Sequence, residues 1–155
     1  MSIAVFGCGG SGGGSSAEGE EPLLTAATLG EQDIRAVDEY LADPEYAGAN
    51  VENGERLAMQ CRACHSYDQG GAHMLGPALY GFFGRKAGSA EGFGYTAALR
   101  SADFVWTPRA MDAWLAQPAV FLPGNAMAYA GLRKQADRQA VIAYLLAETG
   151  KQPSP

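Results

Sequence analysis

Two cysteines and a histidine lie within five residues of one another, in the pattern Cys61-x-x-Cys64-His65. This spacing is typical of covalent haem attachment, because the two thiols can each add to one vinyl group of the porphyrin while the next residue points its imidazole at the iron. A zinc site would need two further soft ligands, and only Cys8 and His73 remain. A thioredoxin-like dithiol pair would need a βαβ context, which the sequence does not show. The pattern therefore favours c-type haem, with zinc and dithiol chemistry as alternatives.

A haem iron bound by His65 needs a second axial ligand from elsewhere in the chain. His73 is only eight residues further on and is expected on the same side of the ring. Met59 lies beside the cysteines, and Met111 fits the apolar face of an expected helix. Met127 ends a Pro-Gly-containing loop, whose rigid geometry can hold a thioether at a fixed distance from the iron. We therefore predict Met127 as the second ligand, with a plain core role as the alternative. A neutral sulfur donor favours Fe(II) and raises the reduction potential relative to two histidines.

The elements that must position these residues are expected to be short helices joined by long loops. Apolar spacing and capping residues predict helices at 31–42, 54–63, 108–117 and 136–148. Residues 66–95 contain 8 glycines and no clear period, which predicts loops. No strand pattern is found. A haem would supply much of the apolar core that such a chain lacks.

Composition limits the function classes. The chain has 155 residues, is 47% hydrophobic and is expected to form one main domain. No apolar run approaches the ~18 residues of a membrane-spanning helix. Residues 1–55 carry 11 acidic side chains and one basic, whereas residues 56–155 carry 6 acidic and 10 basic. Neither half has a basic run or basic residues interleaved with aromatic ones, so nucleic-acid binding is not expected. We expect a monomer.

The N-terminal part differs from the rest. A short apolar stretch ending at Cys8 and followed by a Gly/Ser run resembles the end of a bacterial lipoprotein signal, although no positive region precedes it. The alternative is a free thiol in a flexible tail. The predicted segments are a truncated signal at 1–8, a flexible linker at 9–30, an acidic segment with a short amphipathic helix at 31–49, the main domain at 50–150 and a tail at 151–155.

From about residue 54 to residue 149 the sequence resembles class I cytochromes c, of the mitochondrial and bacterial c2 type. The resemblance depends on many short matches in order, which are Cys61-Arg-Ala-Cys64-His65, His73, Gly76-Pro77, Gly81-Phe-Phe-Gly84-Arg85-Lys-Ala-Gly88, Gly92-Phe-Gly-Tyr95, Trp106, Pro118, Pro123-Gly124, Met127 and Ile142-Ala-Tyr144-Leu145. It implies an all-α cytochrome c fold, with short helices and long loops wrapped around one covalent haem and a flexible N-terminal extension.

The resemblance also implies roles for single residues around the iron. His65 and Met127 would be the axial ligands, and Cys61 and Cys64 would carry the haem. The Pro77 carbonyl would accept the Nδ1 proton of His65 and so fix the imidazole. Two structural roles are implied besides: His73 would link two loops through hydrogen bonds, and Gly54 and Leu57 of the first helix would pack against Tyr144 and Leu145 of the last.

Three residues are implied at a buried haem propionate, and two more depart from the family pattern. Tyr95 and Trp106 would donate hydrogen bonds to the propionate, and Arg85 would balance its charge; the alternatives are core aromatics and a solvated arginine. Leu99 stands where the family often has Asn, and Trp114 where it often has Tyr. Both positions belong to a polar network beside the methionine, so we predict a thinner network and an altered potential.

The family's ring of lysines around the exposed haem edge is largely missing. Ala119, Val120 and Ala126 occupy matching positions, and with Phe121 they are expected to make the rim apolar. Docking on a partner should then depend on apolar contact and tethering more than on charge steering. No lysine lies near enough to replace the methionine at alkaline pH, so the Met–iron charge-transfer band should persist to higher pH.

The expected function is one-electron transfer rather than catalysis. The resemblance implies a quinol:cytochrome c oxidoreductase and a terminal oxidase or photosynthetic reaction centre as partners, a periplasmic location, and a membrane surface if Cys8 is lipidated. The alternatives are a fixed subunit of a larger oxidoreductase, docked through the 31–42 helix, and a haem peroxidase or gas sensor if the Met127 ligand is labile.

Overall fold

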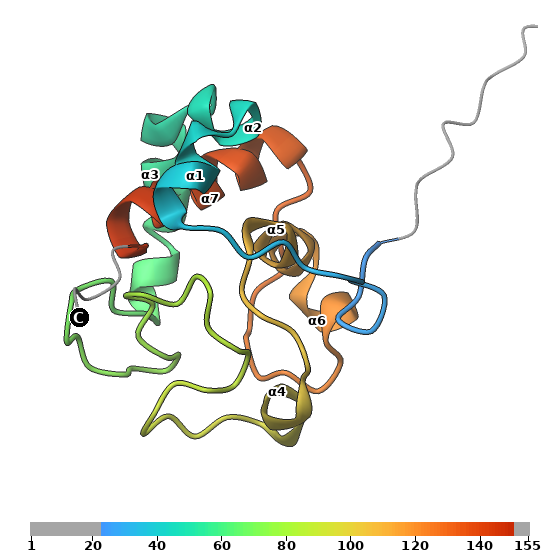
Figure 1. Cartoon of the computed structure of the whole chain (residues 1–155). Helices are drawn as coiled ribbons and strands as arrows, with labels where there is room; N and C mark the ends of the chain where they lie inside the picture. The colour runs from blue at the N-terminus through green and yellow to red at the C-terminus, as the bar shows by residue number, and fades with distance from the viewer. Residues whose placement is uncertain (1–22, 151–155) are drawn as a thin grey trace, which may run out of the picture.

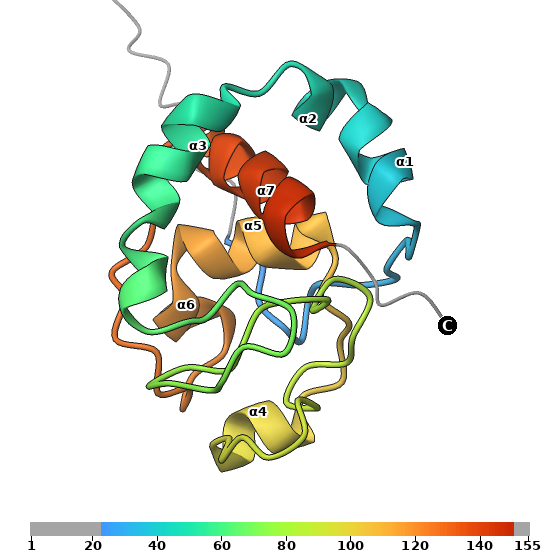
Figure 2. The same ribbon diagram turned by 90° about the vertical axis from the view of Figure 1, so that its left-hand side faces the viewer.

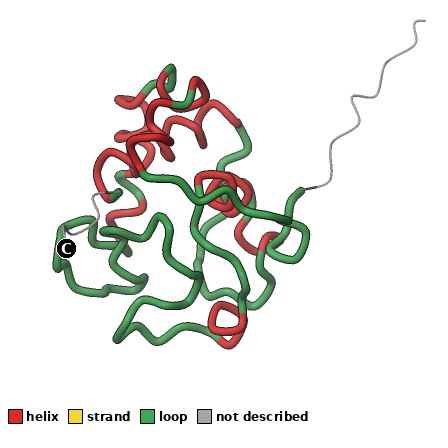
Figure 3. The backbone as a smooth tube through the Cα atoms, in the orientation of Figure 1, coloured by secondary structure: helices red, strands yellow, loops and turns green. Residues whose placement is uncertain are grey.

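The computed structural model describes residues 23–150, which form a helical structure with long loops (Figures 1 and 3). Cys8, the segment 1–8, most of the predicted linker and the tail at 151–155 lie outside the described residues. The elements in chain order are α1 (Val37–Ala42), α2 (Pro44–Ala47), α3 (Val51–Ala58), the 3-10 turn η1 (Cys61–Ala63), α4 (Ala97–Ser101), α5 (Pro108–Ala116), α6 (Pro118–Phe121) and α7 (Gln135–Thr149). Among the described residues the only β pairing is a single antiparallel bridge between Lys86 and Val105. None of the described helices combines the length and apolar character that crossing a membrane requires.

Helices α3 and α7 cross closely and form the centre of the scaffold (Figure 2). A Cβ on Gly54 would lie 2.0 Å from the Ala140 carbonyl oxygen and 3.1 Å from Cβ of Tyr144, so only glycine permits this approach. The C-terminal half of α7 is buried, with Ile142 and Leu146 fully inside. The expected packing of the first family helix on the last is therefore confirmed.

Local capping chemistry explains where the main helices begin. Thr107 accepts a hydrogen bond from the Ala110 amide and Pro108 occupies the first turn of α5, as the sequence predicts. The Asn50 side chain caps α3 in the same way, by accepting from the Asn53 amide at 2.9 Å. The predicted helices at 108–117 and 136–148 agree with α5 and α7 to within one residue at each end. The prediction at 54–63 is less accurate, because α3 begins at 51 and a separate turn carries the cysteines.

The predicted 31–42 helix is wrong in extent. Helix α1 begins only at residue 37, and Ile34 is 56% exposed rather than on a buried face. Pro44 begins a second helix instead of ending the helical structure, since Asp43 caps α2 by accepting from the Glu45 amide at 3.1 Å. Both short helices contact α7, where Tyr40 and Tyr46 are buried.

The prediction of a flexible linker through residue 30 is wrong for residues 23–30. Leu29 is 1% exposed and belongs to the hydrophobic core. The Ala26 amide donates to the Phe121 carbonyl oxygen at 2.8 Å. Leu24 and Ala26 pack against the same core. The small helices α4 and α6 were also not predicted, because they are too short to leave a periodic signal.

We predict that Gly54→Ala destabilises the haem-loaded protein by about 1–3 kcal/mol, because the new methyl group forces α3 and α7 apart. Chemical denaturation measures the free energy of unfolding. The matched control is Gly94→Ala, where an added Cβ meets no heavy atom within 4 Å. Equal stability of the two variants would contradict the proposed close approach of the helices.

Candidate haem site

The turn η1 brings the two thiols and the histidine together. The amides of Cys64 and His65 both donate to the Cys61 carbonyl oxygen, at 3.0 and 2.9 Å. Both cysteines are half-buried free thiols, and burial raises the pKa of the Cys61 thiol. Among the described residues no three His, Cys, Asp or Glu side chains gather to hold a metal ion, so the zinc alternative has no ligand set in residues 23–150.

The ring of His65 is fixed from one side by the backbone. Its Nδ1 lies 2.7 Å from the Pro77 carbonyl oxygen, which can only accept, so Nδ1 carries the proton and Nε2 keeps its lone pair. Burial lowers the pKa of His65, with the bond to Pro77 acting in the opposite direction. A neutral imidazole with a free Nε2 is the form that binds a metal.

A close backbone approach holds the same ring from another side. A Cβ on Gly76 would lie 2.2 Å from Cε1 of His65 and 2.7 Å from its Nε2. The Gly76 amide also donates to the Cys64 carbonyl oxygen at 2.8 Å. The loop that supplies Pro77 is therefore fastened directly to the cysteine turn.

Met127 lies in a loop that the Asn125 side chain organises. The Asn125 amide group donates to the carbonyl oxygens of Pro118 and Leu122, at 2.9 and 2.8 Å, and its oxygen accepts from the Met127 amide at 2.9 Å. Gly124 has a φ of +86°, which favours glycine. These bonds hold the backbone of Met127 against α6.

The thioether of Met127 has its own partner. Nε1 of Trp114 donates to Sδ of Met127 at 3.2 Å, and the Trp114 side chain is buried. An indole has no acceptor, so this chain of hydrogen bonds ends at Trp114. Leu99, on α4, is aliphatic and cannot extend it. This arrangement agrees with the thinner hydrogen-bond network predicted from Leu99 and Trp114. One hydrogen-bond donor to the sulfur remains, which is the Trp114 indole.

The three predicted propionate residues come from neighbouring loops. The Trp106 amide donates to the Arg85 carbonyl oxygen at 2.9 Å, which places these two residues side by side. The Arg85 guanidinium also donates to the Ala78 carbonyl oxygen at 3.4 Å. Burial raises the pKa of Tyr95, and the nearby charge of Arg85 opposes that effect. Arg85 and Trp106 thus lie side by side, and the shared propionate role of the three residues stays a prediction.

His73 joins two loops, as expected. Its Nδ1 accepts from the Ala78 amide at 2.9 Å, and its Nε2 donates to the Glu91 carbonyl oxygen at 2.8 Å. Both ring nitrogens are occupied, so His73 is a structural residue and not a second axial ligand.

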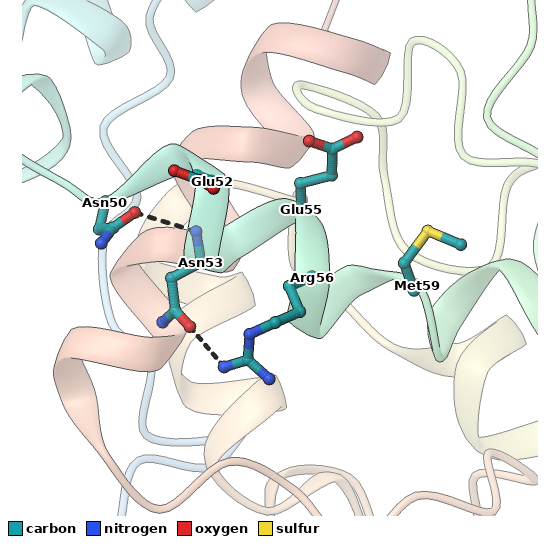
Figure 4. A pocket seen from close by; sticks show the side chains of 6 residues that line it. All are labelled: Asn50, Glu52, Asn53, Glu55, Arg56 and Met59. Carbon is teal, nitrogen blue, oxygen red and sulfur yellow. Dashed lines mark hydrogen bonds between the residues drawn. The ribbon is translucent and has the colours of Figure 1, made fainter.

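A surface depression lies away from these residues, along one side of α3 (Figure 4). Two hydrogen bonds, from the Asn53 amide to Asn50 and from Arg56 to Asn53, join three of the residues that line it. None of the predicted site residues lines it. This depression is therefore separate from the candidate haem site at Cys61, Cys64 and His65.

The described residues fit a covalent haem. Two unpaired thiols, an imidazole with a free Nε2 and a thioether that keeps one lone pair are the donor set that the group needs. Gly76 further leaves room where a side chain would displace the His65 ring.

Comparison with known proteins agrees with this geometry. A sequence model of the cytochrome c family matches residues 51–148. This chain belongs to the cytochrome c family. It is 39% identical to cytochrome c of Gibberella zeae over 100 residues, which cover 64% of this chain and 94% of the relative. It is 47% identical to cytochrome c of Trypanosoma brucei brucei over 77 residues, covering 50% and 83% of the two chains.

A bacterial relative shows the same similarity. A cytochrome c homolog of Bradyrhizobium diazoefficiens is 41% identical over 98 residues, which cover 63% of this chain and 53% of the relative. The resemblance to class I cytochromes c and the all-α fold are confirmed. The protein is a haem-based electron carrier with one haem c attached through Cys61 and Cys64.

Sequence reasoning missed two residues that shape the site. Asn125 precedes Met127 by two positions, a spacing that allows an Asx turn and could have been noticed. Gln32, in the acidic segment, forms hydrogen bonds with the backbone of Val105. The two residues are 73 positions apart, so no local sequence pattern predicts this contact.

We predict that Gly76→Ala alters the visible spectrum of the haem and lowers the free energy of unfolding by about 1–3 kcal/mol, because the new methyl group occupies the place of the His65 ring. Absorption spectroscopy and denaturation measure the two effects. The control is Gly48→Ala, whose Cβ would meet only the Pro44 carbonyl oxygen at 3.7 Å. A Gly76→Ala spectrum identical to that of the control would show that this approach does not position His65.

Proposed function

We propose that the protein is a one-electron carrier whose haem iron is bound axially by His65 and Met127. The observation that carries this proposal is the hydrogen bond of Trp114 Nε1 to Sδ of Met127 at 3.2 Å, which orients a thioether that would otherwise rotate freely. When bound, the haem supplies an iron that alternates between Fe(II) and Fe(III).

The chain's own residues prepare both sides of this site. Pro77 holds the His65 imidazole in the tautomer that presents Nε2, and Asn125 holds the backbone of Met127. Since the contacts come from a fixed backbone, little rearrangement is needed when the charge on the site changes. With two protein ligands, no axial position stays open to a substrate, which favours electron transfer over a peroxidase or gas-sensing role.

Redox partners follow from this role. We propose electron donation by a quinol:cytochrome c oxidoreductase and acceptance by a terminal oxidase or a photosynthetic reaction centre. The expected location is the bacterial periplasm, where thioether attachment is made, with Cys8 as a candidate lipid anchor. The 31–42 segment proposed for docking in a larger oxidoreductase has Tyr40 buried, and its helix α1 contacts α7 of this domain. This burial favours a separate carrier.

The surface around the cysteines supports docking by apolar contact. Met59 is 57% exposed two residues before the cysteine turn, and Leu75 is 84% exposed next to Gly76, whose amide bonds to that turn. Val120 is exposed on α6, together with Ala119. The inclusion of Phe121 in this rim was wrong, because its ring is 1% exposed and packs between Phe104 and Trp114.

Replacement of the proposed sulfur ligand tests the assignment. We predict that Met127→Ala abolishes the Met–iron charge-transfer band and lowers the midpoint potential, because the iron loses the donor that favours Fe(II). Visible spectroscopy and redox titration measure both effects. The control Met59→Ala removes an exposed thioether beside the cysteines. An unchanged spectrum and potential in Met127→Ala would refute the ligation, and a high-spin ferric wild type would favour the peroxidase alternative.

The docking proposal has a separate test. We predict that the oxidation rate of the reduced protein by oxidase-containing membranes changes less than about tenfold with ionic strength, since Ala119, Val120 and Ala126 put no charge at the rim. Val120→Lys should make the rate more sensitive to salt, because it adds a steering charge, and Val120→Ala is the matched control. A steep decline of the wild-type rate with rising salt would contradict docking by apolar contact.

A further inference from the structure

Residues 23–34, here called the strap, cross the domain from α6 over α5 toward α1 (Figure 1). The strap lies outside the family match at 51–148, yet it contributes to the hydrophobic core. We propose that the strap is a brace that positions Trp114, and through Trp114 sets how readily Met127 leaves the iron. This inference rests on the proposed ligation by Met127.

The first contact of the strap is with the short helix α6. The Ala26 amide donates to the Phe121 carbonyl oxygen at 2.8 Å, satisfying a group at the end of that helix. Leu29 is 1% exposed within the core cluster that includes Phe121. The ring of Phe121 in turn meets the Trp114 ring edge-on, with the centroids 5.9 Å apart. The strap therefore fixes one neighbour of Trp114.

The second contact is with the backbone beside Trp106. Nε2 of Gln32 donates to the Val105 carbonyl oxygen at 2.6 Å, and the Val105 amide donates to Oε1 of Gln32 at 2.8 Å. Nε2 also lies 3.3 Å from Oγ1 of Thr107. Val105 forms the isolated bridge with Lys86, where the ladder bonds come from its flanking residues, so its own amide is left for Gln32. Its carbonyl oxygen accepts from both Gln32 and the Thr107 amide, the latter at 2.9 Å.

These two contacts hold Trp114 between fixed neighbours. Trp106 follows Val105 in the sequence, and its ring meets the Trp114 ring edge-on, with the centroids 5.3 Å apart. Trp114 thus contacts one ring from the segment before α5 and one, Phe121, from α6. The indole that donates to Sδ of Met127 is thus packed against two rings near the strap. The strap binds the carbonyl oxygen of Phe121 itself, and it binds Val105 and Thr107, the residues on either side of Trp106. If the strap is released, those rings are free to move and Trp114 no longer holds the sulfur in place. The fraction of molecules in which Met127 is not bound to the iron then rises.

Imidazole added to the ferric protein is the probe, because it binds iron only where Met127 has left. Loss of the Met–iron charge-transfer band during titration gives its apparent affinity. For Gln32→Ala we expect an apparent affinity roughly tenfold higher than in the wild type, since the bonds to Val105 and Thr107 are lost. The matched control is Gln139→Ala, which removes one exposed hydrogen bond, at 3.1 Å, to Glu45 of α2. The control should bind imidazole as the wild type does, to within about twofold.

The outcomes separate this inference from the proposed ligation. If folded Gln32→Ala binds imidazole with the wild-type affinity, the proposed brace is wrong. It is also wrong if Gln32→Ala and Gln139→Ala show the same increase in imidazole affinity, because that result indicates general destabilisation. Leu29→Val, which shortens the buried side chain without removing a hydrogen bond, is the second variant if Gln32→Ala does not fold, and its affinity should rise in the same direction. A wild type without the band would refute ligation by Met127, and the brace with it.

Discussion

One hydrogen bond, from the indole of Trp114 to the sulfur of Met127, is the constraint on which the site depends. A methionine side chain has three rotatable bonds and a weakly directional sulfur, so its own stereochemistry does not place the thioether. The sulfur is positioned by the buried indole of Trp114, and the rings of Trp106 and Phe121 hold that indole in place. Aromatic packing among α5, α6 and Trp106, which precedes α5, therefore sets the location of a single sulfur atom.

The histidine side of the site is positioned by backbone groups rather than by aromatic packing. His65 is positioned by a backbone carbonyl and by a glycine that leaves room for its ring. The two sides belong to separate loops, and the α3–α7 pair carries the cysteine turn at the end of α3. Long loops can carry the chemistry because the cysteine turn fastens one of them and Asn125 fastens the other.

The sequence predicted features with a local physical cause and missed those formed between distant residues. The Thr107-Pro108 cap and the CxxCH spacing are local, and both were interpreted correctly. Helices of four or five residues such as α4 and α6 are too short to show a period. The strap was assigned partly to a linker because its stabilising contacts are between distant residues. Ala26 bonds to Phe121, 95 positions away, and Gln32 bonds to Val105, 73 positions away, and no sequence pattern connects either pair. Trp114 was predicted as a cofactor-binding residue in the network beside the methionine, but its bond to the sulfur was not, because no local spacing shows where an indole nitrogen points.

Proton NMR of the reduced protein tests the central claim most directly. A methyl group bound through its sulfur to the iron lies over the face of the macrocycle, where the ring current shields it strongly. We predict a three-proton resonance far upfield of the protein envelope, assigned to Met127 and close enough to the Trp114 indole proton to give a nuclear Overhauser effect. A spectrum without an upfield methyl resonance, or one in which that methyl shows no contact with the indole, would contradict the account.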